Sequence, residues 1–209
     1  MRTRFLLAGI VVLIACLMSH GLAISDEIEN LVRNGDFEQA ADLVQWGLDD
    51  KNSVATMSID NKDAATGDSS LFLEIFALDP AASWVPNVQQ QQHSLEKGTT
   101  YTYSAFLKAE EPKSITMDVK EDGGSWQSYK NQSFSVKTEW EEYWFTFQAQ
   151  EDAPAMVLEF QNTNSEISHW IDGVRFYVGE YVPTLEDQEE AVEPSGKLPT
   201  TWAAIRTQY

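Results

Sequence analysis

Apolar and polar residues alternate along most of the chain between residues 70 and 178. About seven runs have this period of two, which is typical of β-strands with one face buried. Turn-forming clusters separate the runs, and no amphipathic helix of ordinary length interrupts them. The pattern predicts an all-β fold, a two-sheet antiparallel β-sandwich of the jelly-roll type, over residues 27–182. The side chains expected to face inward are Leu71, Leu73, Ile75, Tyr101, Tyr103, Ala105, Leu107, Ile115, Met117, Val119, Tyr143, Phe145, Phe147, Met156, Leu158, Phe160, Val174, Phe176 and Val178.

The first 23 residues have the pattern of a secretory signal peptide. Arg2 and Arg4 precede an apolar run that ends at Met18, and small residues then suit cleavage after Ala23. The run is too short, and acidic residues follow it too soon, for a membrane span. A second interpretation is a bacterial lipobox that ends at Cys16, which would then carry a lipid anchor. We therefore expect a secreted or cell-surface protein without disulfides, because Cys16 is the only cysteine.

The net charge of the chain limits the kinds of partner that it is expected to bind. Removal of residues 1–23 takes away two of 14 basic residues and none of the 33 acids, which leaves a net charge of −21. Such a surface repels nucleic acid and anionic lipid headgroups, so neither is an expected partner. It suits neutral ligands and divalent cations.

Residues 183–209 differ in composition from the rest. An acid-rich segment without a basic residue is followed by Pro194 and Gly196, which is typical of a solvated linker. The last residues place Trp202, Ile205 and Tyr209 at helical spacing. They form either a short helix that docks on a protein partner or a tail without regular structure, since isolated helices of this length are marginal in water.

Five motifs in the expected order resemble carbohydrate-binding modules of the family 4/9 type, and together they cover nearly all of residues 28–178. They are residues 30–38 (NLVRNGDFE) with Trp46, Gly67 with Ser70 and Leu71, residues 98–104 (GTTYTYS) with Lys108 and Ala109, residues 139–147 (EWEEYWFTF), and residues 170–174 (WIDGV). The resemblance implies a galactose-binding-domain-like jelly roll without catalytic activity. It also implies glycan binding on the concave face of one sheet, and a structural calcium ion.

The resemblance puts calcium ligands at Glu38 and Asp172, with Asp36 and Asp68 as further candidates. The first and last strands of a sandwich often lie side by side, where acids on both can share one hard cation. The alternation gives Asp172 the inward parity of Val174, and a buried carboxylate needs a cation or several hydrogen-bond donors. The alternative for Glu38 is an ordinary solvated acid at a strand end.

Sugar rings stack on flat aromatic side chains, while amides and charged groups bind their hydroxyls. Candidates are aromatic residues that the core does not use. Trp84 precedes a polar strand with four consecutive glutamines, of which the resemblance favours Gln90; a bulge would substitute Gln89 or Gln91.

Four further aromatic residues are candidates for ligand contact. Trp126 and Tyr129 are expected in a loop at the rim of the cleft, and Phe106 and Trp144 on the non-core faces of their strands, as its floor. Trp46, Trp140 and Trp170 are assigned to the core.

The sequence offers little for catalysis. It has neither an HExxH nor a GxSxG motif, and its three histidines, His20, His93 and His169, are far apart. We therefore expect a non-catalytic carbohydrate-binding module with a poly- or oligosaccharide ligand. The alternative is a calcium-stabilised β-sandwich that serves adhesion or assembly and binds no sugar.

Overall fold

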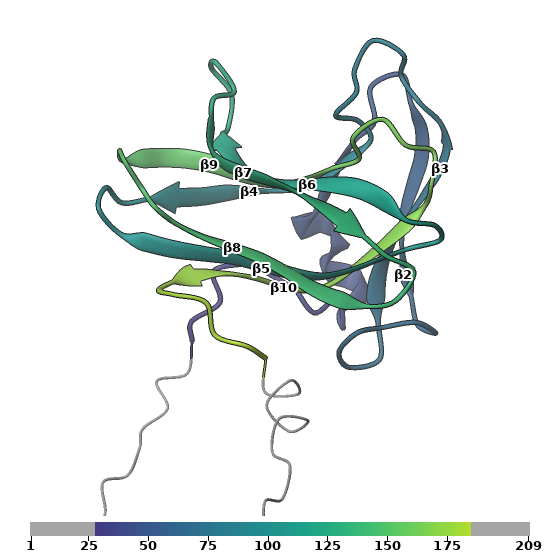
Figure 1. Ribbon diagram of the computed structural model, residues 1–209, viewed down its shortest axis with the longest axis horizontal. Coiled ribbons are helices and arrows are strands. Elements are labelled where there is room, and N and C mark those ends of the chain that lie inside the picture. Colours follow the sequence, from purple (N-terminus) through teal and green to yellow (C-terminus); the bar gives the residue numbers. More distant parts are fainter. Residues whose placement is uncertain (1–27, 185–209) are drawn as a thin grey trace, which may run out of the picture.

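The structure is a computed structural model, and it describes residues 28–184. These residues form two five-stranded antiparallel sheets that pack face to face, as predicted (Figure 1). Sheet A contains, in spatial order, β1 (Gly47–Asp49), β4 (Asn87–Leu95), β9 (Ala153–Gln161), β6 (Lys113–Glu121) and β7 (Ser128–Val136). Sheet B contains β2 (Val54–Asp60), β3 (Ser70–Ala77), β10 (His169–Val178), β5 (Thr100–Ala109) and β8 (Glu141–Gln148). A 3-10 helix, η1 (Ala40–Gln45), precedes β1.

The predicted alternation is confirmed along the central strands. The expected inward-facing residues from Leu71 to Phe176 all pack in or against the core between the sheets. Each large apolar side chain buried in this way contributes about 1.5–3 kcal/mol to folding. Val178 is an exception: at the end of β10 it is 60% exposed, so its assignment to the core was wrong. The strands that the pattern misses, β1, β2 and β7, all lie at sheet edges, where little burial leaves the alternation weak.

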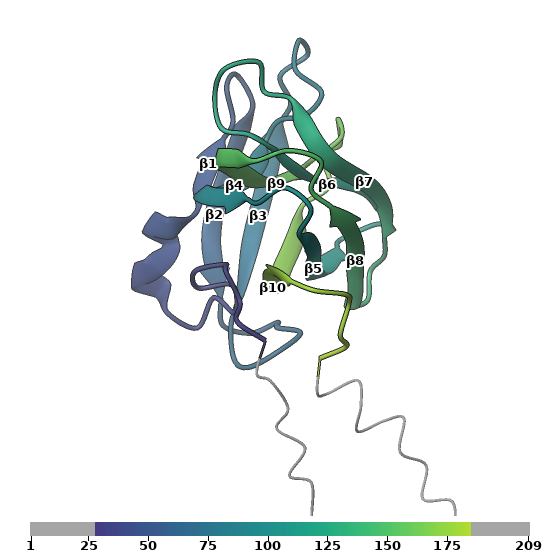
Figure 2. The same ribbon diagram turned by 90° about the vertical axis from the view of Figure 1, so that its left-hand side faces the viewer.

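The two ends of the domain lie side by side, which Figure 2 shows next to β10. The Leu31 amide donates to the Phe176 carbonyl and the Val174 amide donates to the Gly35 carbonyl, both at 2.8 Å. The Asn30 side chain joins the same strand by donating to Val174 O at 2.9 Å and accepting from the Phe176 amide at 3.1 Å. Hydrogen bonds of the backbone and of the Asn30 side chain therefore hold the N-terminal segment against β10.

A β-bulge in β10 overturns the predicted parity of Asp172. The pairing of β10 with β5 shifts between Asp172 and Arg175, so Ile171 and Val174 both face the core. Asp172 instead pairs with Phe106 on the outer side, where it is nonetheless fully buried. Gly173 is the residue that makes the bulge possible, because its φ is +51°.

Two of the three tryptophans assigned to the core lie elsewhere. Trp46 is buried, as predicted. Trp170 stacks on Phe72 with ring centroids 4.6 Å apart, and its Nε1 donates to Asp60. Trp140 donates to Asp63 through Nε1. Both are only partly buried, and the indole N–H of each donates to a carboxylate outside the core.

The signal peptide, Cys16 and the segment with Trp202, Ile205 and Tyr209 lie outside the described residues. Within residues 28–184, no helix has the length and apolar character needed to cross a bilayer.

We expect Gly173→Ala to destabilise the domain more than Gly98→Ala. Both glycines have positive φ, which costs an alanine about 1–2 kcal/mol. At Gly173 a Cβ would also lie 2.9 Å from Phe106 Cδ2, whereas nothing lies within 4 Å of a Cβ at Gly98. The measurement is urea unfolding of both variants. Equal losses in the free energy of unfolding would show that the Phe106 ring moves aside without an energetic cost.

Candidate functional site

The outer face of sheet A carries a row of polar side chains that crosses four strands. The register pairs Gln89 with Glu159, Glu159 with Asp118, and Asp118 with Asn131. The residues that alternate with them face the core. Period-two alternation therefore puts these polar side chains together on one surface although they are far apart in the chain.

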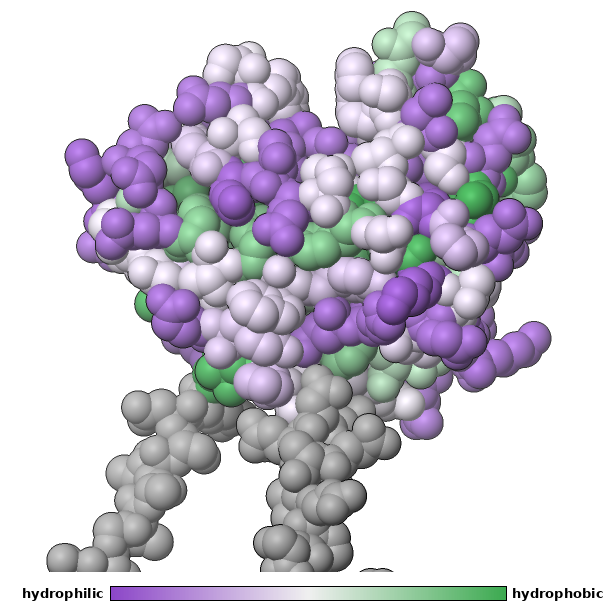
Figure 3. All heavy atoms as spheres, viewed as in Figure 1, coloured by the Kyte–Doolittle hydropathy of each residue, from purple (hydrophilic) through white to green (hydrophobic). Residues whose placement is uncertain are grey.

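Two tryptophans from loops flank this polar row. Trp84 precedes β4 and Trp126 follows β6, and their side chains are 39% and 50% exposed. Strands β4 and β6 run in the same direction because each is antiparallel to β9, so the start of β4 and the end of β6 lie at opposite ends of the sheet face. Figure 1 shows loops rising at both ends, and Figure 3 shows the surface hollowed between them.

The hollow between the tryptophans is a cleft of about 430 Å³, in the size class of small-ligand sites. We call it the sheet A cleft. Its lining residues are Asp49, Lys51, Trp84, Gln89, Asp118, Lys120, Trp126, Glu159 and Gln161.

Hydrogen bonds between two loops hold Trp84 in place. The Asn52 amide donates to Asp79 Oδ2 at 2.9 Å, and the Asp79 amide donates to Ser53 Oγ at 2.9 Å. This joins the β1–β2 turn to the loop that carries Trp84. Lys51 then lies with its Nζ 5.0 Å from the centroid of the Trp84 ring, a cation–π contact that favours one orientation of the indole.

The loop that carries Trp126 is fixed by the end of β6. Glu121 Oε2 accepts hydrogen bonds from the Ser125 amide at 3.0 Å and from its hydroxyl at 2.8 Å, and this holds the pKa of Glu121 below its usual value. The Trp126 amide donates to Gly123 O at 2.9 Å. Lys120 Nζ lies 5.2 Å from the centroid of the Trp126 ring. Both tryptophans thus have a lysine on one face of the ring.

Buried carboxylates orient the accessible groups on the cleft floor. Gln161 Nε2 donates to Asp118 Oδ2 at 3.0 Å and to Glu159 Oε2 at 3.1 Å. Lys120 forms an ion pair of 2.7 Å with Glu159, whose side chain is only 2% exposed. Burial, opposed by the Ser128 hydrogen bond, raises the pKa of Asp118. Because the Gln161 N–H groups are used in this way, its carbonyl oxygen is held as an acceptor for a ligand hydroxyl.

Gln90, the predicted ligand contact, faces the interior. It is fully buried, and its side chain pairs with the Arg33 backbone: Nε2 donates to Arg33 O, and Oε1 accepts from Arg33 N, both at 2.9 Å. The predicted outward direction of Gln90 was wrong, because β4 is regular from Asn87 to Gln90 and its bulge comes after Gln90. Gln89, the stated alternative, has the outward parity and lines the cleft.

Three of the predicted aromatic contacts lie away from the cleft. Phe106 is on the outer face of sheet B, 9% exposed and next to Gly173. Trp144 is on the same face, stacked on Tyr181 at 4.1 Å between ring centroids. Tyr129 belongs to β7 and packs against the core. The non-core face of a strand belongs to the outer surface of either sheet A or sheet B. Alternation alone does not say which sheet a strand joins.

The sequence pattern did not single out four further residues that line the cleft, namely Gln161, Asp118, Glu159 and Asp49. Their signal was present but weak: each is a polar residue beside an apolar one on a strand, as in Glu159-Phe160-Gln161. Only the register shows that the three strands β4, β9 and β6 place such residues in one row.

The predicted calcium ligands Glu38 and Asp172 meet on one loop, residues 65–69. Glu38 Oε1 accepts from the amides of Asp68 and Ser69 at 2.8 and 2.9 Å. Asp172 Oδ2 accepts from the amides of Ala65 and Thr66, both at 2.8 Å. Burial raises the pKa of Asp172 to about 6 even though these amides lower it. The two acids thus close the loop as a clip of carboxylates and backbone N–H groups, which we call the carboxylate clip.

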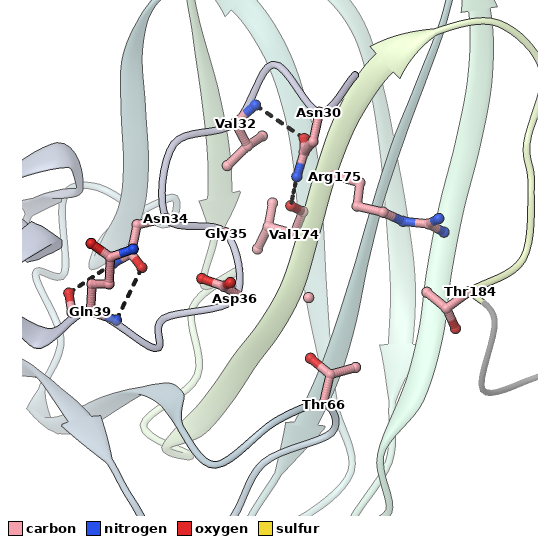
Figure 4. A pocket seen from close by; sticks show the side chains of 11 residues that line it. Asn30, Val32, Asn34, Gly35, Asp36, Gln39, Thr66, Val174, Arg175 and Thr184 are labelled. Carbon is pink, nitrogen blue, oxygen red and sulfur yellow. Dashed lines mark hydrogen bonds between the residues drawn. The ribbon is translucent and has the colours of Figure 1, made fainter. Parts of the chain in front are cut away.

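A second cleft of about 370 Å³ lies beside the carboxylate clip (Figure 4). Asp36 lines it together with Asn34 and Thr66, whereas Asp68 is exposed at the other end of the loop. Within residues 28–184, no three His, Cys, Asp or Glu side chains gather closely enough to hold a metal ion. The four acids therefore do not form a cluster of side-chain ligands; a cation here would bind to the oxygens that the N–H groups leave over and to backbone carbonyls.

Comparison of the sequence with protein families gives one match. The model of a family described as "Carbohydrate binding domain" matches residues 29–166. A search of curated proteins finds no match.

Several solved structures have folds similar to that of this chain. A CBM4 structure is similar with a TM-score of 0.57 and 21% identity, over 71% of this chain and 99% of that one. A tandem CBM22 domain from Paenibacillus barcinonensis Xyn10C has a TM-score of 0.56 and 13% identity, over 76% and 49%. A xylan-binding domain from CBM 22 has a TM-score of 0.52 and 17% identity, over 71% and 95%. Identities this low show a shared fold.

We expect His93 to make the domain less stable in acid. Burial, and then the charge of Arg33, lower the pKa of His93 from 6.5 to about 4. The unfolded chain therefore binds a proton at a higher pH than the folded chain, and stability falls as the pH drops from 6.5 to 4, by about 3 kcal/mol in total.

The measurement is urea unfolding of the natural chain and of His93→Gln between pH 7 and pH 4. Asp172, with its raised pKa, changes stability in the opposite direction over part of this range, so the difference between the two proteins is the quantity to compare. A constant difference across the range would contradict the assignment.

Proposed function

The chain belongs to the carbohydrate binding domain family, and from this we propose that its sheet A cleft binds a polysaccharide or oligosaccharide without cleaving it. The observation that carries the proposal is the pair Trp84 and Trp126 on either side of a polar floor. Sugars need this combination, because their C–H faces stack on indoles while their hydroxyls require fixed donors and acceptors.

The cleft supplies donors and acceptors in positions that hydrogen bonds have already fixed. The two buried carboxylates hold the Gln161 side chain through its Nε2, and this orients its carbonyl oxygen as an acceptor. Gln89 lies diagonally across from Gln161, two residues along β4 from Asn87, the cross-strand partner of Gln161. Preorganised groups lose little entropy when a ligand binds. Open clefts nevertheless bury few ligand atoms, so we expect modest affinity that increases with the number of sugar units.

The charge of the chain favours a neutral glycan backbone. A net charge of −21 on the chain without residues 1–23 repels a polyanion over roughly 8–10 Å in physiological salt. Asp49, Asp118 and Glu159 outnumber Lys51 and Lys120 in the lining of the cleft. A polyanionic glycan therefore meets repulsion both at long range and in the cleft.

In this proposal the carboxylates of Asp118 and Glu159 orient neighbouring side chains and do not react with the glycan. A glycosidase needs one acid free to protonate the leaving group and a second free to act as base or nucleophile. Glu159 is paired with Lys120, and Asp118 accepts from Ser128 Oγ at 2.6 Å. Both are at least 95% buried, so neither is placed to reach a glycosidic bond.

We also propose a calcium ion at the carboxylate clip and a location outside the cell. The support for calcium is the meeting of Glu38 and Asp172 on one loop, together with the resemblance of their motifs. The support for secretion, or for a lipid anchor at Cys16, is the N-terminal sequence. A protein partner for the segment with Trp202 and Tyr209 rests on helical spacing alone.

Affinity electrophoresis in gels that contain xylan, β-glucan or an acidic polysaccharide tests the proposal. We expect a neutral polymer to retard the chain, and a reducing-sugar assay to detect no cleavage. Retardation by none of the polymers would favour the adhesion or assembly module that binds no sugar. Steady release of reducing ends by the pure protein would contradict the assignment as a binding module.

We expect Trp84→Ala to weaken retention by the neutral polymer at least tenfold while the melting temperature hardly changes. Stacked aromatic side chains at binding sites are worth about 2 kcal/mol, and Trp84 is 39% exposed. Trp144→Ala is the matched control, because Trp144 is 42% exposed but lies on sheet B. Equal losses of binding in both variants would place the site elsewhere.

We expect added calcium to raise the melting temperature, and a chelator to lower it again. A ligand that binds only the folded state adds about 2.7 kcal/mol at a hundredfold excess over its dissociation constant. Asp172→Ala should lower stability and abolish the response to calcium, whereas Trp84→Ala should keep that response. An unchanged melting temperature in calcium and in chelator would mean that the N–H donors close the clip on their own.

A further inference from the structure

A smaller hollow, different from the cleft beside the carboxylate clip, adjoins the sheet A cleft across β4. Its volume is about 170 Å³, and Gln89 lines both it and the cleft. The remaining lining includes the Arg33 guanidinium and the side chains of Gln45 and Gln91. A ligand that lies in the cleft can therefore extend past Gln89 into this hollow, which we call the Arg33 hollow.

The guanidinium of Arg33 is held rigidly by neutral groups. Its Nε donates to Gln45 Oε1 at 2.8 Å, and its Nη2 donates to Gln91 O at 2.7 Å. The backbone of Arg33 is fixed as well, by the two hydrogen bonds with the Gln90 side chain. These contacts leave Nη1 without a hydrogen bond to any residue between 28 and 184.

Among residues 28–184, Arg33 also has no carboxylate ion-pair partner, although the chain has 33 acids in all. The ion pairs among residues 28–184 join Lys108 to Asp63, Lys120 to Glu159, Lys137 to Glu141 and Arg175 to Glu142. Arg175 is the other arginine in this part of the chain, and it is paired with Glu142 at 2.6 Å. The Arg33 guanidinium is thus held in position with donors to spare, in a hollow lined in part by glutamine residues. An anionic group is the acceptor that such a guanidinium binds best.

We propose that the Arg33 hollow binds a carboxylate carried by the glycan, such as that of a uronic acid branch on a neutral backbone. The inference rests on the proposed function, because the backbone of the glycan has to occupy the sheet A cleft. The planar guanidinium suits a planar carboxylate, and the amides of Gln45 and Gln89 offer further donors beside it, whereas the Gln91 amide donates to Asp122.

An isolated acidic branch is compatible with the charge of −21. Repulsion from distant acids is screened beyond roughly 8–10 Å, whereas the contact with Arg33 acts at hydrogen-bond distance. A polyanion accumulates repulsion with every sugar unit, but a sparsely substituted neutral chain presents one carboxylate to one guanidinium. The hollow therefore predicts a preference for sparse acidic substitution.

The test compares each neutral polymer that retards the full chain with a sparsely carboxylated form of the same polymer. Xylan is compared with xylan that carries glucuronic acid branches, and β-glucan with β-glucan in which a small fraction of primary hydroxyls is oxidised to carboxylates. Three variants are measured with the natural chain: Arg33→Gln, Arg33→Lys and Lys62→Gln. Lys62 is exposed, lies outside both hollows, and controls for the loss of one positive charge.

We expect the natural chain to bind the carboxylated form about three- to fivefold more tightly, the range of a partly exposed ion pair. Arg33→Gln should abolish this preference and leave binding of the neutral form unchanged. Arg33→Lys should keep part of it, Lys62→Gln all of it, and added salt should reduce it.

Equal binding of both forms by the natural chain would overturn the inference and leave the proposed function intact. So would an Arg33→Gln variant that binds both forms equally less well, because Arg33 would then only hold the N-terminal segment against β4. If no polymer of any pair retards the natural chain, the proposed function fails, and this inference fails with it.

Discussion

The packing of aromatic rings between the two sheets is the interaction on which the rest of the structure depends. Tyr103 of sheet B lies 5.5 Å from Phe160 of sheet A and 6.2 Å from Phe176 of its own sheet, measured between ring centroids. These rings are fully buried, and burial of such side chains is the main favourable term in folding. Because the apolar side chains of each strand face the core, the polar side chains that alternate with them must face outward. On sheet A these polar side chains form the floor of the cleft.

Two bulges decide which side chains reach the surface. The bulge of β4 comes after Gln90, so that Gln89 points into the cleft and Gln90 supports Arg33 from beneath. The bulge of β10 turns Asp172 away from the core and under the loop at residues 65–69, where backbone amides donate hydrogen bonds to it. An extra residue in a strand reverses the facing of everything beyond it, so each bulge changes the chemistry of a whole strand end.

Buried charges in this protein position other groups. Asp118 and Glu159 hold Gln161, and Asp172 together with the exposed Glu38 holds the loop at residues 65–69. Each buried carboxylate has its hydrogen-bond donors, which offsets the cost of removing it from water. The groups left accessible are amides, lysines and indoles, which are suited to reversible binding of a hydroxylated ligand.

The sequence by itself determined the fold class and the core. Period-two alternation identified β3, β5, β6, β8, β9 and β10, since each buries one face, but not the edge strands β1, β2 and β7, which bury little. Strand β4 was expected only from its run of polar residues after Trp84. Trp84 and Trp126 also stood out from the sequence, because they follow or precede turn residues outside the alternating runs.

Only the tertiary structure decided which of the candidates share a surface. Alternation places Phe106 and Trp144 outside the core, but the sheet to which their strands belong puts them on the face opposite the cleft. The approach of Gln89, Glu159 and Asp118 depends on the register of three strands separated by up to 70 residues. Arg33 was part of a recognised motif, yet its hollow exists only because the N-terminal segment is held against β4. Local sequence sets the direction of a side chain relative to its own strand, whereas its neighbours across the sheet are set by long-range pairing.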